Sequence, residues 1–164
     1  MSEIRIRKRH RLREKEVRAI TEEIVPRLGV EIFGPGDTVD RAEGSDFDVV
    51  FVNGDVVALI QDGKAFLTVR GLLKYKPSKS FVTVDMGAVP YVSKGADVMT
   101  PGIVEADRNI REGDFVWIRD VKNRVPLAIG KALVSGEEMA KKQPGKAVKT
   151  VHFVGDKLWK YGED

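Results

Sequence analysis

The residue types that perform catalysis are sparse in this chain. It has two histidines, His10 and His152, and no cysteine, so it has no thiolate nucleophile and no cysteine-based zinc site. His10 lies in a run of arginines and is more typical of a surface residue than of a catalytic base, and neither histidine has further ligands at metal-binding spacing. Asp46 and Asp48 are paired carboxylates in a segment without any other catalytic signal. We therefore expect no catalytic residue, no metal site and no cofactor.

The stretch from Val84 to Ile103 (VDMGAVPYVSKGADVMTPGI) could instead bind a ligand, because it combines three glycines with a Lys-Gly pair. Glycine permits a positive φ and the close approach of another backbone or a ligand. We expect a short helical turn over 88–93, a break at Gly95, and a strand that begins at Asp97. Pro101-Gly102 suits the central positions of a type II turn.

These residue types suit the binding of RNA. Lys94 would place a positive charge beside Gly95, whose missing side chain would let a phosphate or a terminal ribose approach. Val98 and Met99 could form the floor of a pocket against which an unpaired base stacks. Both could equally belong to a hydrophobic core, and Pro101-Gly102 could simply form a corner of a barrel.

Asp97 is the exception in this stretch, because its negative charge would repel a phosphate near Gly95. The side chain either points away from the RNA or accepts hydrogen bonds from a ribose or a base. The sequence leaves both alternatives open.

Charge is segregated along the 164 residues, although the net charge is only +3. Residues 1–13 hold six Lys/Arg against one Glu, residues 28–69 hold two against eight acids, and residues 70–95 hold five against one. Such segregation is typical of proteins that bind nucleic acids, although solvated surfaces of a protein from a hot environment would also explain it. The candidate basic patch consists of Arg5, Arg7, Lys8, Arg9, Arg11, Arg13, Lys74, Lys76 and Lys79.

The composition is that of a soluble globular protein, with 42% hydrophobic and 32% charged residues. No apolar run approaches the roughly 18 residues that span a bilayer, and the N-terminus is charged where a signal peptide is apolar. We expect a cytoplasmic protein without membrane association.

The first half of the chain predicts a helix and a small antiparallel sheet. Ile4 and Ile6 alternate with arginines, which indicates either an edge strand or a basic arm that orders on binding. An apolar stripe with helical spacing ends at Gly29. Two hairpin signals, Asn53-Gly54 and Asp62-Gly63, separate further elements: strands over 47–52, 55–60 and 65–69, and a short helix over 71–75 that Pro77 closes.

The second half predicts many short strands, which favours a closed or nearly closed barrel. A short helix over 135–142 begins at the N-cap Ser135. We expect strands near 81–85, 97–105, 114–120, 125–134, 147–154 and 157–161. The fold class is therefore α+β: an N-terminal α/β module with one main helix (residues 1–77), followed by a β pseudo-barrel with short helices (residues 78–164).

The segment 95–102 (GADVMTPG) fits the Gly-x-x-(Val/Leu)-Met-x-Pro-Gly pattern of the PUA domain, a small RNA-binding pseudo-barrel. Further resemblance to that domain covers 115–118, 127–133, 135–139 and 150–159. Residues 66–75 (FLTVRGLLKY) resemble the pre-PUA region of the malignant T-cell amplified protein family and its archaeal relatives, which work in translation. The chain thus resembles a pre-PUA domain with a basic arm (1–77) followed by a PUA domain (78–164).

The resemblance implies which residues contact RNA. PUA domains bind RNA with this helix-loop-strand edge and with the last strand, which we place at 156–160. The RNA-binding residues are then Lys94, Gly95, Ala96, Asp97, Val98, Met99, Pro101, Gly102, Lys157 and Lys160.

The resemblance also implies a non-enzymatic function in translation. The PUA domain would hold the 3′ acceptor end of tRNA, and the first domain would dock on the small ribosomal subunit during initiation, reinitiation or recycling. A partner with a SUI-type domain is a further expectation. The alternative is an RNA-binding accessory subunit for a tRNA or rRNA modification enzyme.

Overall fold

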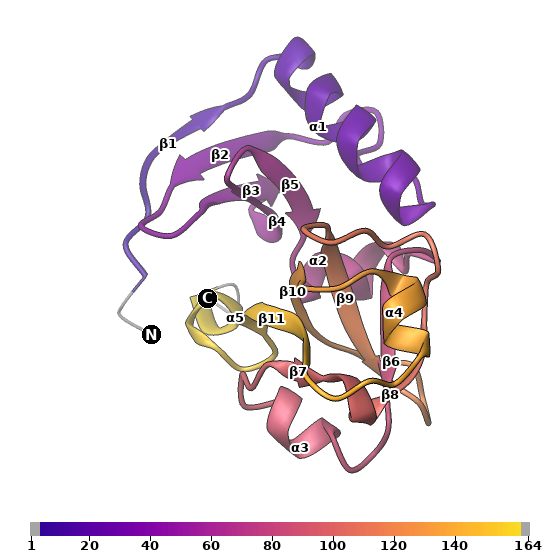
Figure 1. The fold of residues 1–164 in the computed structure, drawn as a ribbon. Coiled ribbons are helices and arrows are strands. Elements are labelled where there is room, and N and C mark those ends of the chain that lie inside the picture. The colour runs from indigo at the N-terminus through magenta and orange to yellow at the C-terminus, as the bar shows by residue number, and fades with distance from the viewer. Residues whose placement is uncertain (1–3, 162–164) are drawn as a thin grey trace. The chain divides into compact units, whose positions relative to one another are not determined.

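A computed structural model describes residues 4–161 of the chain. They divide into two compact units, with the boundary in the chain between Ser78 and Lys79, and the chain end from Lys160 is assigned to the first unit. The sequence placed the division after residue 77, and the idea that each part folds as a domain stays a prediction. The two units are described separately below (Figure 1).

Unit 1 is a five-stranded antiparallel sheet with two helices. The strands follow the order of the chain: β1 (Arg7–Arg11), β2 (Val39–Glu43), β3 (Asp48–Val52), β4 (Asp55–Gln61) and β5 (Lys64–Leu67). Helix α1 (Glu14–Leu28) packs against β5, and α2 (Val69–Tyr75) packs against β4 and β5.

The predicted apolar stripe forms the buried face of α1. Ile20, Ile24 and Leu28 are buried, and Gly29 ends the helix in the left-handed conformation with φ of 68°. The Glu23 side chain accepts a hydrogen bond from the backbone N–H of Ala65 at the start of β5 (2.8 Å). Burial of the stripe against the sheet supplies the main stabilisation of this helix.

Three features of unit 1 differ from the sequence predictions. The basic segment is an edge strand, but it begins at Arg7, after the two isoleucines. The acidic residues before the predicted meander include β2, which was not predicted. The strand expected over 65–69 ends at Leu67, because the Thr68 hydroxyl accepts the N–H of Gly71 and caps α2, so this helix starts before residue 71.

Unit 2 is built on a six-stranded sheet in the order β7-β11-β10-β9-β6-β8. Its strands are β6 (Phe81–Val84), β7 (Val98–Met99), β8 (Ile103–Ala106), β9 (Phe115–Asp120), β10 (Pro126–Ala132) and β11 (Lys146–Phe153). β7 and β8 lie at opposite ends of this order, yet only the 3-10 turn η1 (Thr100–Gly102) joins them. The sheet therefore curls into a nearly closed barrel, and the predicted α+β fold class is confirmed.

Three short helices accompany the barrel: α3 (Val89–Val92), α4 (Gly136–Ala140) and α5 (Lys157–Tyr161). The predicted turn over 88–93 and the predicted N-cap Ser135 are confirmed, since Ala88 precedes α3 and the Ser135 hydroxyl accepts the N–H of Glu138. The core of the barrel includes Val82, Ile118 and Met139, all fully buried.

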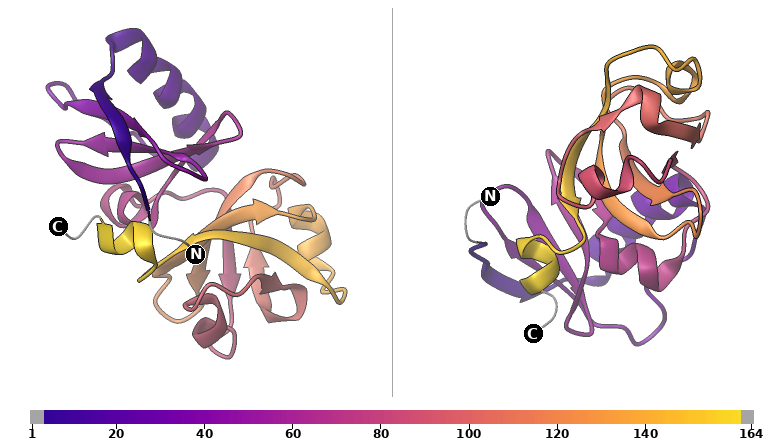
Figure 2. Two further views of the ribbon diagram at one scale, coloured as in Figure 1. Left: turned by 90° about the vertical axis from the view of Figure 1, so that its left-hand side faces the viewer. Right: turned by 90° about the horizontal axis from the view of Figure 1, so that it is seen from below.

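Three predictions for unit 2 were wrong. The strand expected over 97–105 is split by η1, because Pro101 has no N–H to donate to the neighbouring strand. The turn at Pro101-Gly102 is not of type II, because Gly102 does not have the positive φ that this turn requires. The strand expected over 157–161 is helix α5, into which β11 continues (Figure 2). The Asp156 carboxylate accepts the N–H of Trp159 (2.9 Å) and caps this helix.

Candidate nucleic-acid interface

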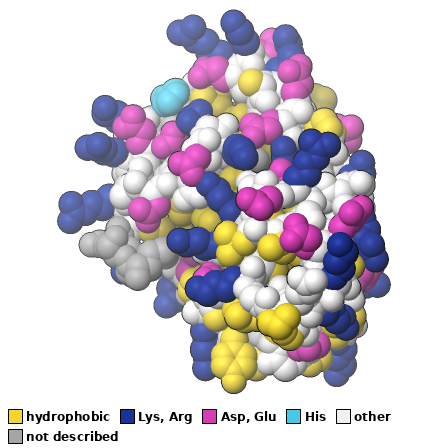
Figure 3. Space-filling view, viewed as in Figure 1, with side chains coloured by type: hydrophobic (Ala, Val, Ile, Leu, Met, Phe, Trp, Pro, Cys, Tyr) yellow, Lys and Arg dark blue, Asp and Glu magenta, His cyan; other side chains and the backbone are white. Residues whose placement is uncertain are grey.

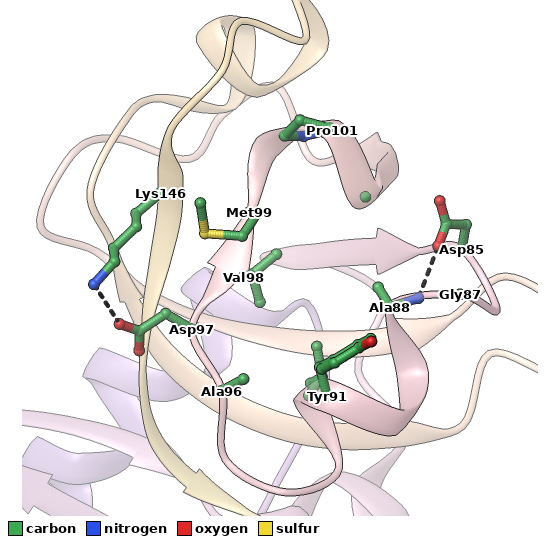
Figure 4. Close-up of a pocket in the computed structure, with 12 residues that line it drawn as sticks. Asp85, Gly87, Ala88, Tyr91, Ala96, Asp97, Val98, Met99, Pro101 and Lys146 are labelled. Carbon is green, nitrogen blue, oxygen red and sulfur yellow. Dashed lines mark hydrogen bonds and ion pairs between the residues drawn. The ribbon is translucent and has the colours of Figure 1, made fainter.

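A pocket of about 580 Å³ opens on unit 2 between α3, η1 and the adjacent strands β7 and β11. Figure 4 shows α3 on one side and Lys146 of β11 on the other. The lining residues are Asp85, Gly87, Ala88, Tyr91, Val92, Ala96, Asp97, Val98, Met99, Pro101, Gly102 and Lys146. Six of the ten predicted RNA-binding residues therefore meet in this pocket, namely Ala96, Asp97, Val98, Met99, Pro101 and Gly102.

The backbone around α3 is held by internal hydrogen bonds. The Asp85 carboxylate accepts the N–H of Ala88 (2.9 Å). The N–H of Gly95 donates to the Val92 carbonyl, and the N–H of Ala96 donates to the Tyr91 carbonyl, both at 3.0 Å. These three N–H groups are engaged within unit 2 and are not free to donate to a ligand.

Gly95 breaks the helical turn as predicted, with φ of 95°. The space that its missing side chain leaves is nevertheless filled. A Cβ at this position would lie 2.6 Å from the ring of Phe153 in β11. The glycine is thus required by packing inside unit 2, and neither Lys94 nor Gly95 lines the pocket.

Val98 and Met99 have separate roles, although the sequence treated them together. Val98 is 1% exposed and belongs to the core, whereas Met99 is 48% exposed and lies at the pocket surface. Tyr91 on α3 is 69% exposed, more than any other large hydrophobic side chain that the structure describes. The pocket therefore presents an aromatic ring and a thioether to solvent.

Asp97 is paired with β11. One carboxylate oxygen accepts the backbone N–H of Thr150 (3.0 Å), and the other lies 3.4 Å from the Lys146 ammonium. Figure 4 shows this ion pair at one wall of the pocket. The negative charge of Asp97, which would repel a phosphate, is therefore compensated by the neighbouring Lys146 ammonium.

Sequence reasoning missed Lys146 and Tyr91. Lys146 lies opposite Met99 in the pairing of β11 with β7, 47 positions away in the chain, so only tertiary structure shows their proximity. Tyr91 lay within the glycine-rich stretch, and an aromatic residue in a predicted surface turn was a usable signal. Hydrophobic side chains gather over the lower part of unit 2, near α3, with Lys and Arg side chains beside them (Figure 3).

The basic strand β1 is largely paired with acids of β2. Arg9 and Arg11 both contact Asp40, while Arg7 and Lys8 lie within 4.0 Å of Glu43. The hydrogen bond from Arg11, with further help from Arg9, lowers the pKa of the Asp40 carboxyl despite some burial. Their role in RNA binding stays a prediction, as it does for the exposed Arg5, Arg13, Lys74, Lys76 and Lys79.

Lys157 and Lys160 are exposed on α5 and do not line the pocket. The buried His152 is hydrogen-bonded through Nδ1 to the Asp156 carboxylate (2.8 Å), so its ring has a polar partner inside the protein. Within residues 4–161, no group of three His, Cys, Asp or Glu side chains could hold a metal ion.

The comparisons with known proteins identify the family. The model of the PUA domain matches residues 81–154. The malignant T-cell-amplified sequence 1 homolog of Drosophila melanogaster is 30% identical over 156 residues, which cover 90% of this chain and 86% of that protein. Translation machinery-associated protein 20 of Eremothecium gossypii is 31% identical over 124 residues, which cover 71% of this chain and 68% of that protein. The chain belongs to this family of PUA-domain proteins.

Archaeal relatives share nearly the whole length of this PUA-domain protein. An uncharacterized protein of Methanocaldococcus jannaschii is 39% identical over 166 residues, covering 95% of this chain and 98% of that protein. The crystal structure of a hypothetical protein from Pyrococcus horikoshii has a TM-score of 0.83 at 37% identity, covering 94% of this chain and 99% of that chain.

The PUA domain suggests RNA binding, and the names of the relatives suggest a role in translation. No helix within residues 4–161 combines the length and the hydropathy needed to cross a membrane.

Proposed function

We propose that this PUA-domain protein is a non-enzymatic RNA-binding protein of the translation machinery. Its pocket on unit 2 receives unpaired nucleotides at the 3′ acceptor end of a tRNA. Unit 1 docks on the small ribosomal subunit during initiation, reinitiation or recycling. Family membership supports RNA binding and a role in translation, and the pocket supports the part of the proposal that concerns the tRNA end.

The observation that carries the proposal is the combination of groups at the pocket. The exposed ring of Tyr91 and the exposed Met99 offer a surface for stacking of a base. Lys146 places a cation at the wall, where it can contact a phosphate. A volume of about 580 Å³ is sufficient for a nucleotide-sized ligand.

The test is a titration of the protein with a single-stranded RNA that ends like a tRNA acceptor. Tyr91→Ala removes the stacking ring and should weaken binding by about 1–3 kcal/mol, or roughly fivefold to 150-fold. Tyr91→Phe keeps the ring and should bind like the parent. Because Tyr91 is 69% exposed, both variants should unfold at nearly the parent temperature. Equal affinity of all three proteins would contradict the proposed site.

A partner with a SUI-type domain would complete the proposed function on the ribosome. The competing function is that of an accessory subunit for an RNA-modifying enzyme. Co-purification from the native source distinguishes the two. Recovery of the small ribosomal subunit and a SUI-type protein supports the translation role, whereas recovery of a modification enzyme supports the competing one.

A further inference from the structure

The connection between α4 and β11 is strongly basic. Between Glu138 and Asp156 the chain has no acidic residue. The same segment contains four exposed lysines, which we call the lysine turn: Lys141, Lys142, Lys146 and Lys149. The charge segregation described above for residues 1–95 did not include this segment.

The lysine turn has fewer ion-pair partners than β1. Among the residues described by the structure, Lys146 pairs with Asp97, and Lys141, Lys142 and Lys149 pair with no carboxylate. The cations of β1, by contrast, share the carboxylates of Asp40 and Glu43. An anionic partner would therefore gain more from the lysine turn, since three of its four charges are not already paired with a carboxylate of the described residues.

A pair of lysines on adjacent strands also favours an anionic partner at this surface. Lys149 of β11 lies directly opposite Lys131 of β10. Like charges in this arrangement destabilise a sheet, and the Lys131 ammonium lies over the ring of Phe115 (5.4 Å from its centroid). A phosphate bound beside the two ammonium groups would reduce the repulsion between them.

The lysine turn adjoins the pocket. The Thr100 N–H in η1 donates to the Gly145 carbonyl (2.9 Å), and Lys146 is paired with Met99 across β7 and β11. In Figure 1 the connection from α4 to β11 passes beside β7. A strand of RNA leaving the pocket on this side would meet these lysines next.

We propose that the lysine turn binds the phosphate backbone of the RNA whose unpaired end occupies the pocket. This inference rests on the proposed function of the pocket. Lysines act as point charges and do not read bases, so the contacts are independent of sequence. The pocket holds the end of the RNA, and the lysine turn sets how tightly a longer RNA binds.

The test uses the triple variant K141A/K142A/K149A and two RNAs, a trinucleotide and a stem with the same three unpaired nucleotides at its 3′ end. The variant should bind the stem roughly tenfold or more weakly at low salt, and the slope of log affinity against log salt should fall by about 2–3, near 0.7–0.9 per lost phosphate contact. Its affinity for the trinucleotide should stay within about twofold of the parent, because so short an RNA makes few of these phosphate contacts.

Two control variants separate this effect from a change in net charge or folding. K15A/R18A/K64A removes three exposed positive charges from α1 and from the start of β5, and it should bind the stem like the parent. K141R/K142R/K149R keeps the charge and should restore the affinity. If K141A/K142A/K149A binds the stem with the parent's affinity and salt slope, the inference is wrong. If the parent itself binds neither RNA, the proposed function fails together with the inference.

Discussion

Tyr91, Met99 and Lys146 each present a different kind of group to the pocket: a ring, a thioether and an ammonium. All three are exposed, and they come from α3, β7 and β11. Because about half or more of each residue is exposed, truncation should affect binding more than folding. This separates them from Val98, which lines the pocket but is 1% exposed and belongs to the core.

Substitution of Gly95, by contrast, should affect folding more than binding. Gly95→Ala should lower the free energy of unfolding by roughly 2–3 kcal/mol, because alanine is strained at φ of 95° and its Cβ would clash with the Phe153 ring. Denaturant unfolding of the variant measures this loss.

A double-mutant cycle checks the cause of that loss. In a Phe153→Ala background the ring is absent, so Gly95→Ala should cost only the backbone strain, about 1 kcal/mol. Should the glycine substitution cost the same in both backgrounds, the contact with Phe153 is not the reason for the glycine.

At the scale of elements, Asp156 connects β11 to α5. Its buried carboxylate accepts hydrogen bonds from His152 Nδ1 and from the N–H groups of Phe153 and Trp159. Burial raises the pKa of Asp156, but the hydrogen bonds and the charge of His152 outweigh burial and lower the pKa below its ordinary value of 3.8. This carboxylate therefore stabilises the folded state only in its ionised form.

The sign of the pH dependence follows from this lowered pKa. The stabilisation by Asp156 is fully present above the unfolded pKa and is lost as the pH falls through the folded pKa. At neutral pH, Asp156→Asn should cost about 1–3 kcal/mol of unfolding free energy. Unfolding between pH 7 and pH 2 should show that the parent loses more stability than Asp156→Asn does. Parallel losses in the two proteins would contradict this role.

Strand β1 gives a second prediction at this scale. It pairs with β2, and the Arg9 guanidinium lies 3.9 Å from the centroid of the Phe51 ring. Deletion of the chain up to Arg11 should therefore lower the unfolding free energy by roughly 1–3 kcal/mol and speed hydrogen exchange in β2. Unchanged stability and exchange would show that the segment is an arm that orders only on binding.

The sequence predicted elements well where a local pattern determined them. The stripe of α1, the hairpins at Asn53-Gly54 and Asp62-Gly63, and the turn before Gly95 all follow from neighbouring residues. β2 was missed because its acidic residues are atypical of a strand between two neighbours, and the cations that pair with them come from β1, about 30 positions earlier in the chain. α5 was mistaken for a strand, although Asp156 directly before it is a typical N-cap residue.

The candidate site was predictable only in part. The residues 96–102 that line the pocket lie within one recognisable motif. Lys146 comes from a distant strand, and the reason for Gly95 is a ring 58 positions away, so both depend on tertiary packing. Sequence reasoning can identify a motif, but it cannot tell which of its residues face solvent and which face the core.

At the scale of the whole molecule, a net charge of +3 is too small to explain RNA binding by itself. The arrangement of the charges matters more: the four cations of β1 share the two carboxylates of Asp40 and Glu43, whereas only Lys146 in the lysine turn has an ion-pair partner among the described residues. Salt should therefore weaken RNA binding through the lysine turn more than through β1.

The most direct test of the RNA site is an NMR titration of the labelled protein with a single-stranded RNA ending in the sequence of a tRNA acceptor. We predict that the largest shifts of backbone resonances fall on α3, on residues 96–102 and on Lys146, with smaller shifts along the rest of the lysine turn. Binding of the RNA with shifts confined to β1, or to any surface that excludes the pocket, would contradict the account.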